Sequence, residues 1–131
     1  MSIEIYFAGP KKVNAKLEGF TVETDQAVRA GGEGSAPTPF ALFLSSLGTC
    51  AGIYVKGFCD QRGLPTQDVS LSLDYTINPA TKNIGKFIIK IFIPSHFPEK
   101  YDSALVQSAS LCAVKRHLDP AIENEIIIVR K

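Results

Sequence analysis

The second half of the sequence contains segments in which apolar and polar side chains alternate, the pattern of a β-strand with one buried face. In residues 69–77 every odd position is apolar and every even position is polar. Turn-forming residues fill 78–85 and the isoleucine-rich segment 86–93 follows, so we expect these two strands to form a hairpin. Residues 125–130 are almost entirely apolar, which predicts a final strand that is buried on both faces.

Shorter strand signals lie near the N-terminus. Residues 3–8, 14–18 and 20–23 favour strands, and glycines and a proline mark the turns between them. Together they predict a small antiparallel sheet. Residues 25–38 contain three glycines and Pro37, and we expect them to form a loop.

A long apolar helix is predicted directly after this loop. Thr38 can cap its first turn, and Pro39 suits the first helical position because the N–H that proline lacks has no intrahelical partner there. Apolar residues then recur every three or four positions, as on one face of a helix: Phe43, Leu47, Cys50, Tyr54 and Phe58. Gly63 is expected to end the helix. Gly48 and Gly52 flank Cys50, which indicates tight packing or close approach of a ligand to the sulfur.

A second helix is predicted over residues 98–118. Pro98 suits its first turn, and Arg116 and His117 suit its last turn, where cations interact favourably with the helix dipole. Its apolar face contains Tyr101, Leu105, Ala109 and Cys112. The expected fold is therefore α+β, with N-terminal antiparallel strands, a long central helix, a β-hairpin, a second helix and a C-terminal strand.

The composition is typical of one globular domain spanning residues 1–131. Apolar residues make up 45% of the chain, and the formal net charge is +1 without a run of basic residues. This charge gives no indication of nucleic-acid binding. The N-terminus lacks the layout of a signal peptide and the apolar segments fall short of a membrane span. We therefore expect a cytoplasmic protein with no membrane contact.

The residues best suited to chemical reactivity are the three cysteines, Cys50, Cys59 and Cys112. An odd number in a cytoplasmic chain argues against a framework of structural disulfides. Cys50 and Cys59 are separated by roughly 13 Å along one helix axis, so they cannot form a disulfide while the helix is intact. Cys50 and Cys112 lie on apolar faces of two helices that we expect to pack together, so their sulfurs can meet. Such a pair suits a peroxidase cycle, in which a thiolate becomes a sulfenic acid and a second thiol closes it to a disulfide.

Other interpretations remain open at this point. Free cysteine often acts as a small buried hydrophobic side chain, so spacing alone also allows a purely structural role for all three thiols. Cys59 has no expected partner and is interpreted as incidental. His96 and His117 have no cysteine or carboxylate neighbours at ligand spacing, so no metal site is expected. The GGEG segment lacks the lysine and the Ser/Thr of a phosphate-binding loop.

Two longer stretches carry a resemblance. The first is GGEGSAPTPFALFLSSLGTC, a glycine-rich loop and a proline before a helix with a cysteine. The second is LCAVKRHLDPAIENEI, a second cysteine followed by a short polar segment and a strand. Together they resemble the OsmC/Ohr family, the osmotically inducible and organic hydroperoxide resistance proteins, over nearly the whole chain. The resemblance implies an OsmC-like fold and an intertwined homodimer, with two sheets around central helices and active sites at the subunit interface.

The same resemblance implies a chemistry similar to that of peroxiredoxins. It makes Cys50 the thiol that attacks the peroxide and Cys112 the resolving thiol, with a thiol reductant as partner and no cofactor. The substrate would be an organic hydroperoxide or hydrogen peroxide. Apolar residues near Cys50 would form the substrate pocket and favour an apolar peroxide: Phe40, Phe43, Leu47 and Tyr54.

The sequence departs from the family at two positions. Phe40 stands where the hydroperoxide reductases have a glutamate that holds an arginine against the reactive thiolate. Ala113 stands where the family usually has proline. These departures make the chain look more like the broader OsmC-like branch. Phe40 also supports an alternative function, a non-catalytic dimer that binds a small apolar or thiol-containing ligand.

A nearby cation raises the thiolate fraction of a cysteine, so an arginine close to Cys50 would activate it. The candidates are Arg29, which can pair with Glu33 at the glycine-rich loop, and Arg62 and Arg116 at the ends of the two predicted helices. Each also suits an ordinary surface position or a helix end. The sequence therefore does not assign an activating arginine.

Overall fold

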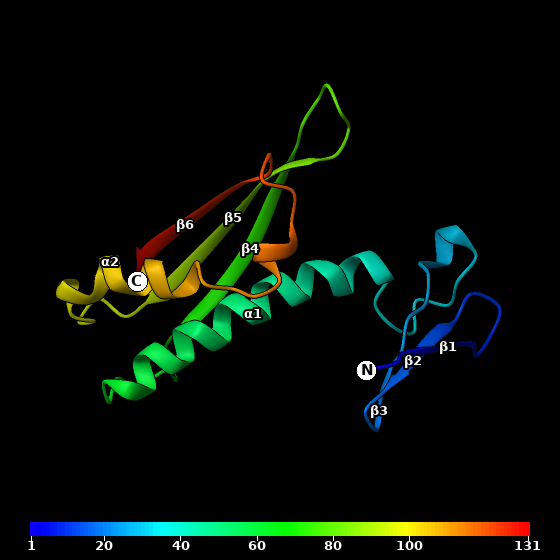
Figure 1. Cartoon of the computed structure of the whole chain (residues 1–131), viewed down its shortest axis with the longest axis horizontal. Helices are drawn as coiled ribbons and strands as arrows, with labels where there is room; N and C mark the ends of the chain where they lie inside the picture. Colours follow the sequence, from blue (N-terminus) through cyan, green and yellow to red (C-terminus); the bar gives the residue numbers. More distant parts are fainter. The chain divides into compact units, whose positions relative to one another are not determined.

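Helix α1 (Pro39–Gln61) forms where the long apolar segment predicts it, in a computed structural model that describes all residues 1–131 (Figure 1). The Thr38 hydroxyl accepts a hydrogen bond from the N–H of Ala41 at 3.2 Å, which confirms the predicted cap. Such a cap contributes about 1 kcal/mol. At the other end, Gly63 adopts φ +66°, the left-handed conformation that ends helices.

The chain divides into two compact units, Met1–Leu44 and Ser45–Lys131, and α1 begins in the first and continues into the second. Both units contain a three-stranded sheet, and the second contains a further helix. The α+β fold class and the order of elements are thus as predicted.

The N-terminal sheet consists of β1 (Glu4–Phe7), β2 (Val13–Leu17) and β3 (Phe20–Val22), all antiparallel in the order β1-β2-β3. This confirms the antiparallel sheet predicted for the N-terminus. The strand register places apolar side chains on one face of the sheet: Ile5, Phe7, Val13, Ala15, Leu17, Phe20 and Val22. The opposite face is polar.

The predicted loop between β3 and α1 is organised by one buried carboxylate. Asp25 is 1% exposed and accepts hydrogen bonds from the backbone N–H groups of Gln26 (2.7 Å), Glu33 (3.3 Å) and Ser35 (3.1 Å). The Ser35 hydroxyl donates a further bond of 2.6 Å. Gly32 is required here, because a Cβ atom would lie 2.0 Å from the carbonyl oxygen of Gln26. The loop also contains a short 3₁₀ turn, η1 (Val28–Ala30).

The second sheet has β5 (Ile84–Ile93) in its centre, antiparallel to β4 (Ser70–Ile77) and parallel to β6 (Glu123–Arg130). The predicted hairpin is therefore confirmed. The expectation that the last strand is buried on both faces is wrong. Because β6 lies at the edge of the sheet, its residues are only half-buried or exposed.

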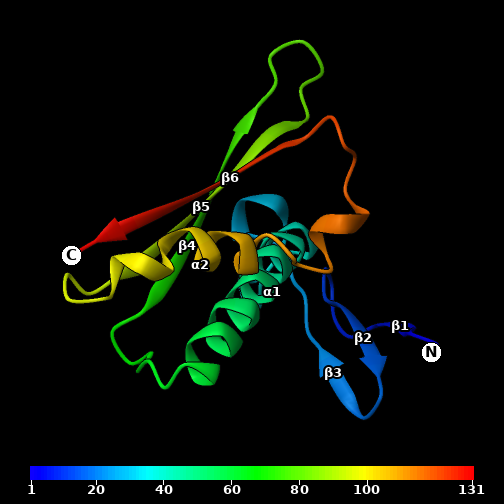
Figure 2. The same cartoon turned by 60° about the vertical axis from the view of Figure 1, so that its left-hand side comes forward.

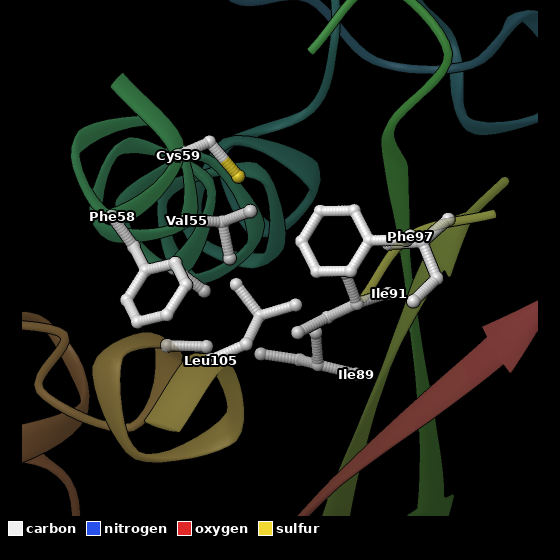
Figure 3. Packing of buried hydrophobic residues seen from close by; sticks show 10 residues of the cluster. Val55, Phe58, Cys59, Ile89, Ile91, Phe97 and Leu105 are labelled. Atoms are coloured by element: carbon white, nitrogen blue, oxygen red, sulfur yellow. The ribbon is translucent and has the colours of Figure 1, made fainter. Parts of the chain in front are cut away.

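Helices α1 and α2 (Asp102–Ala109) pack on the same face of this sheet, the one that carries the odd-numbered residues of β5 (Figure 2). Side chains from these three elements and from the segment after β5 point toward one another in the core (Figure 3). They include Val55, Phe58, Cys59, Ile89, Ile91, Phe97 and Leu105. A salt bridge connects strand β6 to α2. The Arg130 guanidinium donates two hydrogen bonds to the Asp102 carboxylate, at 2.6 and 2.7 Å.

The prediction of one continuous helix over 98–118 is wrong. A 3₁₀ turn, η2 (Glu99–Tyr101), precedes α2, and α2 ends at Ala109. The Ser110 hydroxyl donates to the carbonyl oxygen of Gln107 at 2.6 Å, the local side-chain bonding by which serine competes with helical backbone bonds. A second 3₁₀ turn, η3 (Lys115–His117), follows, so Cys112 lies between helical elements rather than on one.

Helix α1 is long and apolar enough to cross a membrane by length and composition alone, which the sequence analysis did not expect. Five of its side chains, however, are buried in the structure: Leu47, Ala51, Val55, Phe58 and Cys59. Four of these belong to the core that α1 shares with β5 and α2. One face of the helix thus packs in the core.

Replacing Asp25 with asparagine should destabilise the first unit, with an effect that depends on pH. The Ser35 hydroxyl is the largest of the hydrogen-bonding causes that lower the pKa of Asp25 from 3.8 to about 2. A depressed carboxyl pKa contributes stability that is complete above about pH 4 and is lost as the pH falls toward 2. Thermal unfolding of wild type and Asp25→Asn across this range checks the prediction. Asp68→Asn, at an exposed turn residue, is the control. Parallel curves for all three proteins would contradict the role given to Asp25.

Candidate functional site

The structure places the side chains of Cys50 and Cys112 close enough for each to shift the pKa of the other. Cys50 lies on the middle of α1 and is half-buried, whereas Cys112 is only 2% exposed. The Cys112 sulfur lies 4.0 Å from the carbonyl oxygen of Leu47, one turn before Cys50. It also accepts a bond from the N–H of Lys115 at 3.5 Å. The site is therefore formed by one helix and one turn of the second unit.

The surroundings of Cys50 favour its thiolate. Burial acts to raise the pKa of Cys50, but hydrogen bonding and a positive charge outweigh it and hold that pKa below the ordinary value for a thiol. The groups responsible are, in order, the backbone N–H of Val114, the thiol of Cys112, the backbone N–H of Ala113 and the charge of Arg116. Cys50 is thus the thiol of the pair that ionises first.

The pKa of Cys112 is shifted in the opposite direction. Burial raises the pKa of Cys112, and its hydrogen bond to Cys50 raises it further because the proton is held between the two sulfurs. The N–H groups of Lys115 and Val114 only partly offset this rise. Cys112 therefore loses its proton only at a higher pH than Cys50 does. The arrangement supplies one nucleophilic sulfur and one protonated thiol in contact with it.

Cys59 lies apart from this pair. It is 1% exposed and belongs to the core between α1 and β5, where Figure 3 shows its side chain beside Val55. Burial is the main cause that raises the pKa of Cys59, with the negative charge of Asp60 adding to it. The packing of Cys59 is that of a small apolar side chain.

The candidate arginines have different environments. Arg116 lies in η3, is exposed, and acts on Cys50 through its charge. Arg62 stacks on the Phe58 ring, with its guanidinium carbon 3.6 Å from the ring centroid, and donates to the Phe58 carbonyl oxygen at 3.0 Å. Its guanidinium is thus engaged at the end of α1.

Arg29 and Glu33 belong to the first unit, in the loop that precedes α1. Arg29 is exposed. The ion pair that Glu33 forms is with Lys12, at 3.4 Å, rather than with Arg29 as the sequence suggested. The expected Arg29–Glu33 pair therefore does not form in this structure.

The four residues expected to line a substrate pocket lie in different surroundings. Leu47 is buried and lines a small apolar cavity that Cys112 also borders. Tyr54 lines a different, open groove of about 600 Å³ between α1 and α2. Phe40 and Phe43 stack on each other with ring centroids 5.9 Å apart, and both belong to the first unit, where they are 50% and 36% exposed.

Two functional groups were missed by the sequence analysis, the backbone N–H groups of Ala113 and Val114. Backbone donors are present at every residue except proline, so no side chain marks them. The one available signal was alanine at position 113, where the resemblance leads one to expect proline. The glycines beside Cys50 make no tight contact: a Cβ at Gly48 would lie 3.9 Å from Leu73, and one at Gly52 would meet nothing within 4 Å.

No group of three or more histidine, cysteine, aspartate or glutamate side chains is placed to hold a metal ion in residues 1–131. The chemistry that the site offers on its own is that of the two thiols.

Comparison with known proteins adds a family and a fold. A family model described as OsmC-like protein matches residues 32–126. The structure is similar to that of an osmotic stress induced and detoxification response protein from Psychrobacter arcticus, with a TM-score of 0.80 and 18% identity over 98% of this chain and 96% of the other. No curated protein matches the sequence.

Two further structures share the fold at low identity. An OsmC-like protein from Mycoplasma pneumoniae has a TM-score of 0.73 and 14% identity over 99% of this chain and 94% of the other. An organic hydroperoxide resistance protein from Elizabethkingia anophelis has a TM-score of 0.68 and 14% identity over 100% and 97%. At these identities the structural matches establish the fold.

The opposite pKa shifts of the Cys50 and Cys112 thiols predict selective alkylation. At neutral pH, iodoacetamide should label Cys50 first because the lowered pKa of Cys50 gives it the largest thiolate fraction. Cys59 and Cys112, both buried with raised pKa values, should label slowly. Peptide mass spectrometry of the reduced, folded protein measures the three rates, and the same labelling in denaturant provides the control. Equal labelling rates of the three cysteines in the folded protein would contradict the lowered pKa of Cys50.

Proposed function

The chain belongs to the OsmC-like protein family, and on that premise we propose that it is a thiol-dependent peroxidase that reduces organic hydroperoxides or hydrogen peroxide. Family membership and neighbours named organic hydroperoxide resistance proteins support a peroxide-related role at the level of the family. In this proposal Cys50 attacks the peroxide and Cys112 resolves the oxidised product. The observation that carries it is the contact between two thiols whose pKa values are shifted in opposite directions.

The first step is nucleophilic attack by the Cys50 thiolate on the terminal oxygen of the peroxide. A sulfur–oxygen bond forms as the O–O bond breaks, and the released alkoxide takes a proton and leaves as an alcohol, or as water from hydrogen peroxide. Two electrons pass from the sulfur to the peroxide. The product on Cys50 is a sulfenic acid.

The second step joins the two sulfurs. The Cys112 sulfur attacks the Cys50 sulfenic acid, a disulfide forms, and the sulfenic oxygen leaves as water with the thiol proton. Since Cys112 already contacts Cys50, this step needs little movement. An external thiol reductant then returns both cysteines to thiols by exchange and is itself oxidised to a disulfide. The proposal places the protein in the cytoplasm, where such reductants are available.

The preference for an apolar peroxide rests on the side chains that flank Cys50 along α1. Leu47 and Tyr54 lie one turn before and after it, and Phe40 and Phe43 present exposed rings nearer the start of the helix. Leu47 is buried, but the rings of Tyr54, Phe40 and Phe43 retain exposed apolar surface, which favours a hydrocarbon group over a hydrated one.

A second candidate function is non-catalytic binding of a small apolar or thiol-containing ligand. The open groove between α1 and α2 favours it, because both apolar and polar side chains line this groove. Phe40, in place of the glutamate of the hydroperoxide reductases, is the sequence feature that supports it. Sustained turnover of peroxide would exclude this alternative.

We also propose that the protein is a homodimer. The apolar face of the N-terminal sheet includes Ile5, Phe7 and Phe20, which are 60%, 86% and 72% exposed in the single chain. Contiguous exposed apolar surface is typical of a protein–protein interface. A second copy of the chain is the partner that the family resemblance implies.

The peroxidase proposal is tested by replacing each cysteine in turn. Cys50→Ser should abolish consumption of cumene hydroperoxide, because serine lacks the polarisable, readily ionised sulfur. Cys112→Ser should still consume about one equivalent and then stop at the sulfenic acid. Cys59→Ser is the matched control and should keep turnover in the presence of dithiothreitol. Undiminished consumption by Cys50→Ser would end the proposal.

The homodimer is tested by light scattering of the purified protein. Wild type should have the mass of two chains, and the double variant Phe7→Ser/Phe20→Ser should shift toward one chain because the apolar face is lost. The double variant Glu4→Ser/Lys16→Ser alters the opposite, polar face of the same sheet and should leave the dimer intact. A monomeric wild-type protein at micromolar concentration would refute the assignment.

A further inference from the structure

The two sulfurs of the proposed disulfide differ in how closely a molecule from solution can approach them. Cys112 is 2% exposed, whereas Cys50 is half-buried. Ile53 lies three positions after Cys50, and therefore on the same side of α1, and it is 64% exposed. Solvent thus borders α1 on the side that carries Cys50.

The space that adjoins Cys112 is too small for a thiol. It is a cavity of about 10 Å³, no more than a single water molecule needs. Apolar side chains such as Leu47, Phe87 and Ile89 line it, and Cys50 does not. A thiolate attacks a disulfide sulfur along the S–S bond, from the side opposite the sulfur that leaves. Because Cys112 is buried beside so small a cavity, the chain leaves no path for such an approach to Cys112.

The backbone next to Cys112 can stabilise a negative charge on its sulfur. The N–H of Lys115 donates a hydrogen bond to the Cys112 sulfur at 3.5 Å. A hydrogen bond from an N–H to an ionised acceptor is stronger than one to a neutral acceptor. The donor belongs to the backbone of the turn that follows Cys112, so a Cys112 thiolate released from a disulfide keeps this partner.

The leaving-group preference of the two thiols acts in the opposite direction. The thiol with the lower pKa leaves faster, which by itself favours departure of Cys50 and attack on Cys112. This preference slows the release of Cys112, but it does not open a path to its sulfur. Access therefore decides which sulfur is attacked.

We propose that an external thiol reductant attacks the Cys50 sulfur of the Cys50–Cys112 disulfide, and that Cys112 leaves with its charge stabilised by the N–H of Lys115. The inference rests on the proposed function, which supplies the disulfide. The reductant thiolate forms a bond to the Cys50 sulfur as the disulfide bond breaks, and the electron pair of the broken bond goes to Cys112, which then takes a proton. A second thiolate attacks the reductant's sulfur in this mixed disulfide, releases the Cys50 thiolate and forms the oxidised reductant.

The experiment locates the mixed disulfide on the full chain, with glutathione as the reductant. The protein is oxidised with diamide, freed of excess reagent and mixed with glutathione for seconds, after which acid stops exchange and N-ethylmaleimide blocks free thiols in denaturant. Peptide mass spectrometry should find glutathione on Cys50 and N-ethylmaleimide on Cys112, in excess of about ten to one over the reverse arrangement, because access decides the site of attack. Glutathione mainly on Cys112, or equally on both, would overturn the inference. Exchange carried out in denaturant, where both sulfurs are accessible, is the control and should give both adducts.

The variant Leu47→Ala tests the argument from access. It removes part of the wall of the cavity beside Cys112, so the share of glutathione on Cys112 should rise several-fold. Leu105→Ala is the matched control, because Leu105 is also buried but does not line this cavity, and it should keep the wild-type ratio. If Leu47→Ala does not fold, Leu47→Val gives a smaller enlargement of the same cavity. An unchanged ratio in a folded Leu47 variant would overturn the argument from access.

The outcomes separate this inference from the peroxidase proposal, because diamide and not peroxide forms the disulfide. Glutathione on Cys112 in a protein that consumes peroxide would overturn the inference alone. Glutathione on Cys50 in a protein that consumes no peroxide would support the inference and reject the proposed function. A protein in which diamide forms no Cys50–Cys112 disulfide would overturn both.

Discussion

The contact between the Cys50 sulfur and the turn that starts at Cys112 is the interaction on which the proposed chemistry of this protein depends. Two features of packing produce it. Ala51, next to Cys50, is fully buried in the core that α1 shares with β5 and α2. This burial fixes the position of Cys50 relative to that core. Helix α2 ends at Ala109, which lets the chain turn inward and bury Cys112 against Leu47.

The electrostatics of the pair follow from this geometry. Burial alone raises the pKa of both thiols, which would leave two inert cysteines. Hydrogen-bond donors in the turn that starts at Cys112 outweigh burial and lower the pKa of Cys50. The proton shared between the two sulfurs raises the pKa of Cys112 further. One structural feature thus makes one thiol a better nucleophile and keeps the other protonated. In the proposed mechanism, the roles of the attacking and the resolving cysteine are separated by position and not by residue type.

Much of the fold could be predicted from local sequence patterns. The cap at Thr38, the apolar face of α1 and the alternation in β4 depend on residues close together in the chain, and all three of these features are present. The edge position of β6 depends on the topology of the sheet, which an apolar segment does not reveal. The end of α2 depends on competition between Ser110 and the helical backbone, which the apolar periodicity concealed. For the site, residue types identified the two thiols, whereas the donors at Ala113 and Val114 carry no residue signature.

The most direct test of this account is the product of oxidation by peroxide. Reduced protein is treated with one equivalent of cumene hydroperoxide, remaining thiols are blocked, and peptides are analysed by mass spectrometry without reduction. The account predicts a peptide pair joined by a Cys50–Cys112 disulfide, with Cys59 recovered as a blocked thiol. Oxidation that leaves Cys50 and Cys112 unlinked, or that joins either of them to Cys59, would contradict it.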